Sequence, residues 1–200
     1  DMPAGPSEVE VIADESANPA FIAADFLSQA EHGVDSQAML VTASESIVEP
    51  VMQAIREQLD RLPRKEITEK SLSHSRLIVL KDKQEVIDFT NLYAPEHLII
   101  QTTDYADIAG QVENAGSVFM GPYTPESAGD YASGTNHTLP TNGYAKAYSG
   151  VNLDSFIKKI TFQEITADGI RLLGGTIRTM AANEQLDAHK NAVTIRLNTL

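Results

Sequence analysis

The sequence predicts an α/β protein, with a mainly parallel sheet flanked by helices and a helical tail at the C-terminus. Short apolar runs alternate with helical patterns up to residue 120, which is typical of parallel strands joined by helices. After residue 152 the patterns are mostly helical. With 200 residues, of which 42% are hydrophobic, the chain is long enough for one large domain or a domain with an appendage.

Five strands are expected from apolar segments that lie between helical patterns. Because a helix separates each strand from the next, neighbouring strands would run parallel, as in an incomplete Rossmann-like sheet. The expected strands are 8–13, 38–41, 77–80, 98–100 and 117–120.

The intervening helices have recognisable ends and apolar stripes. Asn18 is a good N-cap and Pro19 suits a first turn, so a helix is expected over 19–32, with Gly33 ending it. In the next helix, apolar residues recur at i+4 steps. The remaining expected helices are 47–59, 67–73, 83–93 and 104–112.

The pattern changes after Gly121. Residues 121–150 are rich in Gly, Pro, Ser, Thr, Asn and Tyr, and an irregular segment of that length is usually functional or flexible. We therefore divide the chain near residue 145, into an α/β part over 1–145 and a helical tail over 146–200. In the tail we expect helices at 153–159, 166–182 and 185–195, and a short strand at 160–163.

The composition excludes several classes of protein. The chain has 28 acidic and 15 basic residues, and a net charge of −13 repels phosphate backbones, so no nucleic-acid partner is expected. Without cysteine there can be no disulfide, thiolate metal site or cysteine nucleophile. No membrane-length apolar run or signal peptide is visible, so we expect no membrane partner and a cytoplasmic location.

Gln29 and His32 form the most informative pair in the sequence. At i, i+3 spacing near the end of a helix they would project from one face, where an amide oxygen and an imidazole can hold one ion. For an isolated pair, a polar helix end in solvent is the preferred explanation. A metal site therefore needs further ligands from elsewhere in the chain.

Glu96 and His97 lie between a helix and a strand, and strand ends in open α/β sheets are where ligands collect. A neighbouring Glu and His offer two proton-transfer groups to one substrate, because His titrates near neutrality and burial can tune a Glu. An exposed loop pair explains these residues equally well.

Asp130 and His137 lie in the irregular segment, close to glycines that allow close backbone approach. Asp130 could ligate a metal, whereas His137 could be a ligand or could cap a turn. Glu184 and His189 lie in the helical tail, where a lone histidine is more often a surface or core residue. No G-x-G-x-x-G turn or Walker loop is present, so these residues alone show no nucleotide site.

Several motifs, taken together, carry a family resemblance. They are DMPAGPSEV at 1–9, LSQAEHG at 27–33 with DSQ at 35–37, YAPEHL at 93–98, GDYASGTNH at 129–137 with LPT at 139–141, and YSG at 148–150. In order and in combination they resemble the histidinol dehydrogenase family over nearly the whole chain. The combination is specific, although no single motif would be.

The resemblance implies a zinc enzyme that oxidises L-histidinol to L-histidine in two NAD-dependent steps, through L-histidinaldehyde, at the end of histidine biosynthesis. The implied zinc ligands are Gln29, His32, Asp130 and His189. The implied substrate-binding residues are Ser7, Gln29, His32, His97, Asp130, Glu184 and His189.

The resemblance also implies roles for a catalytic pair. His97 would be the general base that removes the hydroxyl proton, and Glu96 would activate water for attack on the aldehyde. Zinc would anchor and orient the substrate. In a homodimer, Glu184 and His189 would complete the site of the partner subunit, which makes the tail a dimerisation segment.

The chain departs from the family in length. Family members are longer, and the chain resembles only their C-terminal half, while the other half contributes much of the NAD site. A first strand so close to residue 1 also looks like a chain cut from something longer. Two alternatives stay open: a fragment that binds zinc and histidinol without catalysis, and a zinc hydrolase in which Glu96 works with a metal-bound water.

Overall fold

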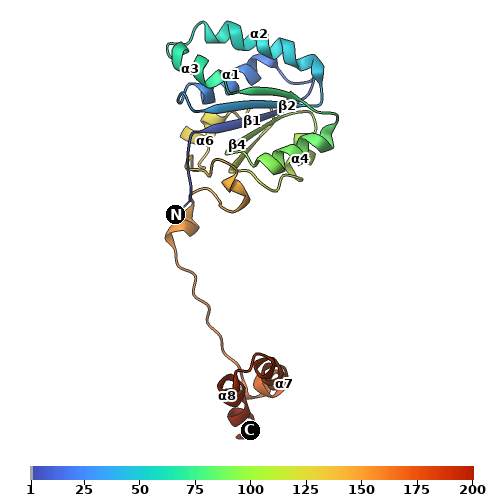
Figure 1. Cartoon of the computed structure of the whole chain (residues 1–200), viewed down its shortest axis with the longest axis vertical. Helices are drawn as coiled ribbons and strands as arrows, with labels where there is room; N and C mark the ends of the chain where they lie inside the picture. Colours follow the sequence, from blue (N-terminus) through green and yellow to red (C-terminus); the bar gives the residue numbers. More distant parts are fainter. Residues whose placement is uncertain (1) are drawn as a thin grey trace. The chain divides into compact units, whose positions relative to one another are not determined.

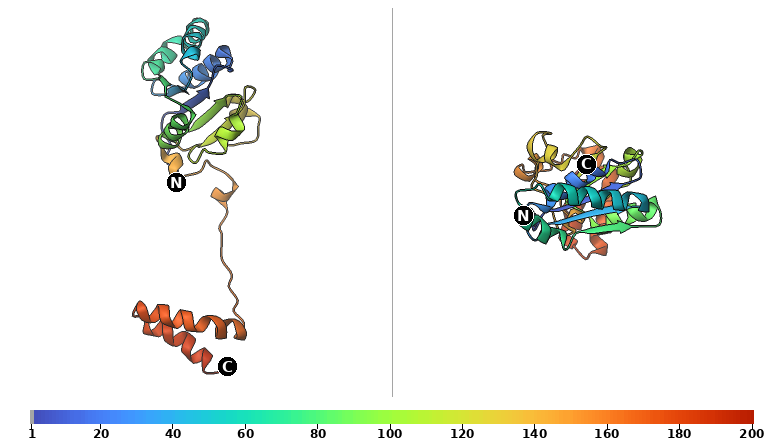
Figure 2. Two further views of the ribbon diagram at one scale, coloured as in Figure 1. Left: turned by 90° about the vertical axis from the view of Figure 1, so that its right-hand side faces the viewer. Right: turned by 90° about the horizontal axis from the view of Figure 1, so that it is seen from above.

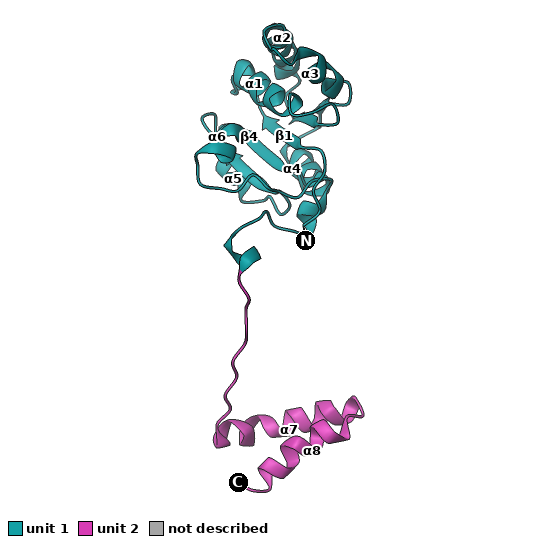
Figure 3. Ribbon diagram, turned by 90° about the vertical axis from the view of Figure 1, so that its left-hand side faces the viewer, with its two compact units in different colours: residues 1–156 teal, residues 157–200 magenta. Residues whose placement is uncertain are grey.

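The computed structural model describes residues 2–200, which form two compact units divided after Phe156 (Figure 3). We expected the division near residue 145. Residues 146–156 instead belong to the first unit, where Val151 N donates to Thr138 O over 3.0 Å.

The first unit is built on a five-stranded parallel sheet with the strand order β3-β2-β1-β4-β5, which confirms the expected α/β class. The central strand β1 pairs with two neighbours, so that Val9 lies opposite both Ala38 and His97. The strands are β1 Glu8–Ala13, β2 Gln37–Thr42, β3 Arg76–Val79, β4 His97–Gln101 and β5 Ser117–Met120.

Helices cover both faces of this sheet (Figure 1 and Figure 2). One face packs against α1 (Pro19–Ala30), α2 (Val48–Leu59) and α3 (Lys65–Leu72), and the other against α4 (Lys83–Tyr93) and α5 (Tyr105–Ala109). Successive strand residues alternate between the two faces, because side chains in a strand have a period of two. The two cores are therefore separate, with Val9, Val11 and Leu40 in one and Ile12, Val41 and Ile100 in the other.

The helix ends follow from local hydrogen bonding. Asn18 caps α1, since its side-chain oxygen accepts from Ala20 N over 2.9 Å. We expected this helix to include His32, but it ends at Ala30, so His32 lies just beyond it. His32 N donates to Gln29 O over 3.2 Å, and this turn keeps the two residues together.

The irregular segment contains more structure than expected. A helix, α6 (Glu126–Tyr131), follows β5, and a short 3-10 helix, η2 (Tyr144–Lys146), lies further along. Another 3-10 helix, η1 (Glu45–Ile47), lies outside this segment and leads into α2. Of these, α6 matters most, because it carries Asp130.

The second unit is a helical hairpin formed by α7 (Ala167–Asn183) and α8 (Asp187–Leu197), as the tail pattern predicted. Gly174 of α7 lies against Leu197 of α8, where a Cβ would come within 2.7 Å of the leucine side chain. None of the helices described over residues 2–200 is long and apolar enough to cross a bilayer.

Two expectations for the tail were wrong. The helix expected at 153–159 is only a 3-10 helix, η3 (Leu153–Phe156), and the strand expected at 160–163 does not form. A strand needs a neighbour for its backbone hydrogen bonds, and the described residues give this segment none.

Candidate active site

The candidate site lies at the amino ends of β1 and β4. Ser7 directly precedes β1, and His97 is the first residue of β4, preceded by Glu96. Because α1 runs back across the sheet after β1, its C-terminal end brings Gln29 to the same edge. The general rule for open α/β sheets places ligands at carboxyl ends, so the reason we gave for expecting a site here was wrong.

A cavity of about 330 Å³ opens at this edge. Five residues that the sequence suggested as site residues line it, and so does His137. The full lining is Ser7, His32, Glu96, His97, Glu126, Asp130, Tyr131 and His137. Residues from four separate parts of the sequence therefore meet at one place in the first unit.

The helix α6 presents two carboxyl groups to this cavity. Glu126 and Asp130 are four residues apart, which places them on one face of the helix. Gly129 lets the helix approach β5 closely, because a Cβ there would lie 2.6 Å from the ring of Phe119. The Phe119 ring in turn contacts the His97 ring, with 5.9 Å between the ring centroids.

A set of metal-binding donors gathers between α1 and α6. One ring nitrogen of His32 and one carboxylate oxygen each from Glu126 and Asp130 lie within 4.8 Å of one another. Imidazole and carboxylate groups are ligands that zinc accepts. The residues present therefore fit a metal ion, and Glu126 belongs to the cluster although we had not considered it from the sequence.

Gln29 is completely buried beside this cluster. Its hydrogen bonds are satisfied when the amide nitrogen Nε2 faces Glu126, donating to Oε2 over 2.8 Å. In that orientation its oxygen accepts from Glu8 N over 3.1 Å. The orientation is assigned from these partners, as is usual for amide groups.

The protonation of His97 is set by the backbone. Its Nδ1 lies 3.0 Å from the carbonyl oxygen of Glu8, and because a carbonyl can only accept, Nδ1 carries the hydrogen. The other nitrogen, Nε2, is buried without a hydrogen-bond partner among the described residues. In the neutral ring Nε2 is then the basic nitrogen.

Glu96 is held beside His97. Its Oε2 accepts from Glu8 N over 2.8 Å and lies 3.5 Å from Nδ1 of His97. Both side chains are buried, and both line the cavity. They are therefore not an exposed loop pair, which was the other explanation that the sequence allowed.

The site carries an excess of negative charge. Burial raises the pKa of Glu126 to about 8, and although the His97 charge lowers it, Asp130 and other carboxylates add to the rise. Burial lowers the pKa of His97, but hydrogen bonding to Glu96 and the negative charges of Glu126 and Glu96 raise it on balance to about 9. A bound cation would offset this charge and lower the pKa of His97.

Two residues to which the family resemblance assigns a role in the site belong to the second unit. Glu184 ends α7 and His189 lies in α8, and both are exposed. They are therefore not among the residues that the first unit brings together. One helical turn separates Glu126 from Asp130, and that spacing was the signal in the sequence that could have identified Glu126.

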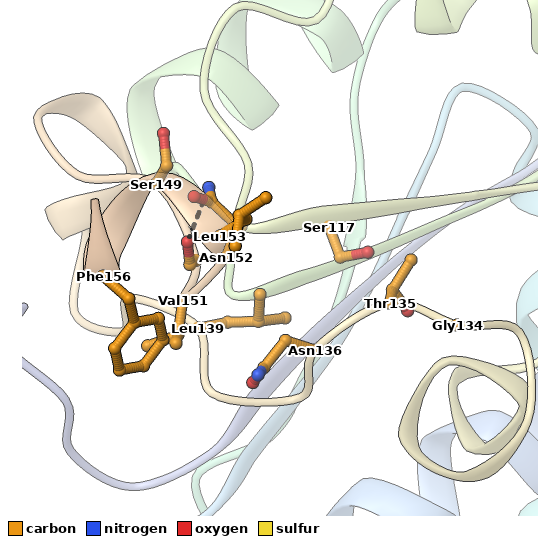
Figure 4. A pocket seen from close by; sticks show the side chains of 12 residues that line it. Ser117, Gly134, Thr135, Asn136, Leu139, Ser149, Val151, Asn152, Leu153 and Phe156 are labelled. Atoms are coloured by element: carbon orange, nitrogen blue, oxygen red, sulfur yellow. Dashed lines mark hydrogen bonds between the residues drawn. The ribbon is translucent and has the colours of Figure 1, made fainter. Parts of the chain in front are cut away.

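A larger cavity, of about 690 Å³, has no titratable side chain in its lining (Figure 4). Polar residues such as Ser117 and Asn136 line it together with apolar ones such as Leu139 and Phe156. The loop that carries Thr135 and Asn136 continues into His137. This second cavity offers no group for acid–base chemistry.

Comparisons with known proteins agree on one family. A family model described as histidinol dehydrogenase matches residues 1–197. Histidinol dehydrogenase from Bacteroides thetaiotaomicron is 69% identical over 200 residues, which are 100% of this chain and 47% of that protein. The chloroplastic histidinol dehydrogenase of Arabidopsis thaliana is 59% identical over 201 residues, covering 100% and 43%.

A solved structure shows the same fold. The crystal structure of histidinol dehydrogenase from Elizabethkingia anophelis matches with a TM-score of 0.94 and 58% sequence identity, over 100% of this chain and 46% of that one. The chain thus spans about half the length of the curated relatives it matches.

Proposed function

The chain belongs to the histidinol dehydrogenase family, and we propose that the natural protein oxidises L-histidinol to L-histidine through L-histidinaldehyde, in histidine biosynthesis, with zinc and NAD. One observation supports this chemistry most directly. His97 lines the same cavity as His32 and Asp130, which carry metal-binding donor atoms, and its Nε2 has no hydrogen-bond partner among the described residues.

Zinc would be held by Gln29, His32 and Asp130, together with the partner's His189. When bound, zinc supplies a fixed positive charge that anchors and orients the nitrogen groups of the substrate. Ser7 and the partner's Glu184 would add polar contacts to the substrate.

Each oxidation removes a hydride from the substrate carbon and a proton from an oxygen that is bonded to that carbon, which is the hydroxyl oxygen in the first step and the oxygen of the added water in the second. In the first, Nε2 of His97 accepts the hydroxyl proton, while Nδ1–H remains bonded to the Glu8 carbonyl, so that the ring keeps its orientation. In the second, Glu96 accepts a proton from the water that attacks the aldehyde carbon, and the carboxylic acid forms after the second hydride leaves.

The hydride acceptor would be held by parts of the protein outside these residues. In a sheet of this type, a dinucleotide-binding turn would follow β1 and contain glycines. The turn here is Asp14–Asn18, which has no glycine and carries two carboxyl groups that repel phosphate. We therefore assign no residue of this chain to NAD.

A homodimer would complete the site. The segment that leads to α7 and the helix itself expose large apolar side chains, which in water favours burial against another chain. Among them are Phe156, Ile160, Phe162, Leu172 and Met180. In a closed dimer, each tail would contribute His189 to the site of the partner subunit. This explains why a proposed zinc ligand is exposed in the single chain.

The function is tested by the stoichiometry of oxidation. The natural protein, loaded with zinc and given excess NAD, should form two NADH for each L-histidinol consumed, because an alcohol becomes an acid by two hydride transfers. Binding of L-histidinol with no formation of NADH would support the non-catalytic alternative. Consumption of a substrate without NAD would support a hydrolase.

A further inference from the structure

We propose that Asp25 is a positioning residue of the active site, which sets the distance between the zinc ligands carried by α1 and the general base carried by β4 through a hydrogen bond to Gln101. The proposal rests on the proposed function, in which zinc holds the substrate and His97 removes its proton. Neither Asp25 nor Gln101 lines the site cavity, and the family resemblance gives neither of them a role.

Asp25 and Gln101 form a buried contact between the helix and the strand. Gln101 Nε2 donates to Asp25 Oδ2 over 2.7 Å, and the two residues are only 3% and 8% exposed. The other end of the Gln101 amide, Oε1, is buried without a partner among the described residues, so the amide is held through its nitrogen. Burial raises the pKa of Asp25 to about 7, but a carboxyl oxygen accepts a hydrogen bond in both protonation states, so the contact persists across neutral pH.

The contact joins the two elements that carry the reacting groups. Asp25 lies one helical turn before Gln29 in α1, about 6 Å along the helix axis. Gln101 ends β4, which His97 begins, and the two lie about 13 Å apart on one face of the sheet. Within residues 2–200, this is the one side-chain hydrogen bond between α1 and β4. It therefore limits how far α1 can slide along the strand that carries His97.

The apolar contacts between α1 and β4 do not replace this hydrogen bond. Ile22 and Phe26 belong to the same core cluster as Ile99, and apolar burial is non-directional. Such packing opposes separation of the helix from the sheet, whereas a buried hydrogen bond also fixes the position along the strand. A substrate held by zinc would then lie at a defined distance from His97 Nε2. A misplacement of about 1 Å in such a geometry can lower a rate about 100-fold.

The test compares kcat, KM for L-histidinol and zinc content in the natural protein and in variants that break or keep the bond. Asp25→Ala and Gln101→Leu each remove it, and each should lower kcat for NADH formation about 10- to 100-fold. Combined, they should cause no greater loss than either alone, because both act through the same bond. Asp25→Asn keeps an acceptor oxygen and should retain most of the native kcat. KM and zinc content should stay near their native values, because every proposed ligand is intact.

A control separates positioning from a merely structural role. Ile22→Val weakens the packing of α1 without changing the hydrogen bond, so it should lower the free energy of unfolding and keep the native kcat. A loss of kcat in Ile22→Val as large as in Asp25→Ala would overturn the positioning role. So would losses that multiply in the double variant, an Asp25→Asn as slow as Gln101→Leu, or a native kcat in Gln101→Leu.

Two variants keep the test decisive if Asp25→Ala does not fold, because Gln101→Leu breaks the same bond and Asp25→Asn keeps it. The kcat of these two variants then decides the matter alone. Failure of the proposed function has a different signature: the native protein itself would form no NADH from L-histidinol.

Discussion

His97 donates a hydrogen bond from Nδ1 to the backbone carbonyl oxygen of Glu8 over 3.0 Å. The contact follows from the sheet itself, because the register of β1 and β4 places His97 beside Val9, the neighbour of Glu8. The backbone N–H of the same Glu8 holds Glu96 over 2.8 Å. The main chain of one strand residue thus orients both members of the proposed catalytic pair.

Zinc binding should depend on the donors that meet between α1 and α6. His32→Ala and Asp130→Ala each remove a proposed ligand, so each should weaken zinc by more than about 100-fold, the upper range for residues outside the ligand shell. Asp107→Ala removes an exposed carboxylate and is the matched control. Metal analysis and chelator competition on the purified natural protein measure the effect. Native zinc content and affinity in both variants would rule out this ligand set.

Glu96→Gln should slow the oxidation of L-histidinaldehyde more than that of L-histidinol. Only the second step needs an activated water, and removing a general base costs about 10²–10⁴ in rate. The glutamine can still accept from Glu8 N, so the local structure should persist. Rates measured separately from the alcohol and from the aldehyde decide the point. If both rates fall by the same factor, the separate roles of Glu96 and His97 are wrong.

Glu10→Gln should make the chain more stable at alkaline pH. Glu10 is fully buried beside Thr90, and burial raises its pKa from 4.5 to about 8. Between pH 4.5 and about pH 8, Glu10 is therefore protonated in the folded state and ionised in the unfolded state. Its contribution to the free energy of unfolding is fully present below the unfolded pKa and is lost as the pH rises toward 8. The variant should gain about 4 kcal/mol over the native chain at about pH 8.5 relative to about pH 5.

Urea unfolding at the two pH values measures this difference. The exposed Glu15→Gln is the control, and its free energy of unfolding should follow the native chain at both pH values. A Glu10→Gln variant with the same pH dependence as the native chain would show that Glu10 ionises normally in the fold.

The sequence predicted the sheet well because its signals are local. The strand Glu8–Ala13 and the helix Lys83–Tyr93 were predicted within their observed bounds, since apolar runs and helical repeats are written into short segments. The strand predicted at 160–163 rested on the same kind of local signal, and that prediction was wrong. A strand also needs a partner, and a local pattern does not reveal whether one exists.

The candidate site was only partly predictable. Spacing alone suggested that Gln29 and His32 would lie close together, and the family resemblance pointed to Asp130. The one-turn spacing to Asp130 could have pointed to Glu126, but its contact with Gln29, almost a hundred positions away in the sequence, could not be predicted. Such contacts depend on how α6 packs on Phe119, which no local pattern in the sequence encodes.

Activity should be restored when two inactive variants share one dimer. His97→Ala disables the first unit of its own chain, and His189→Ala disables the tail of its own chain. After random reassociation, half of the dimers are mixed, and each mixed dimer has one site built from intact parts, so about a quarter of native activity should return. Recovery of no activity in verified mixed dimers, or an active monomer on sizing, would exclude a site shared between subunits.

The rate of NADH formation by His97→Asn tests most directly whether the cavity at the amino ends of β1 and β4 is the site of oxidation. Asparagine can still donate to the Glu8 carbonyl, but it has no basic nitrogen to replace Nε2. The natural protein carrying this change should keep its zinc and bind L-histidinol, yet form NADH about 10²–10⁴ times more slowly than the native protein. A His97→Asn variant that binds zinc and oxidises L-histidinol at the native rate would contradict the proposed site.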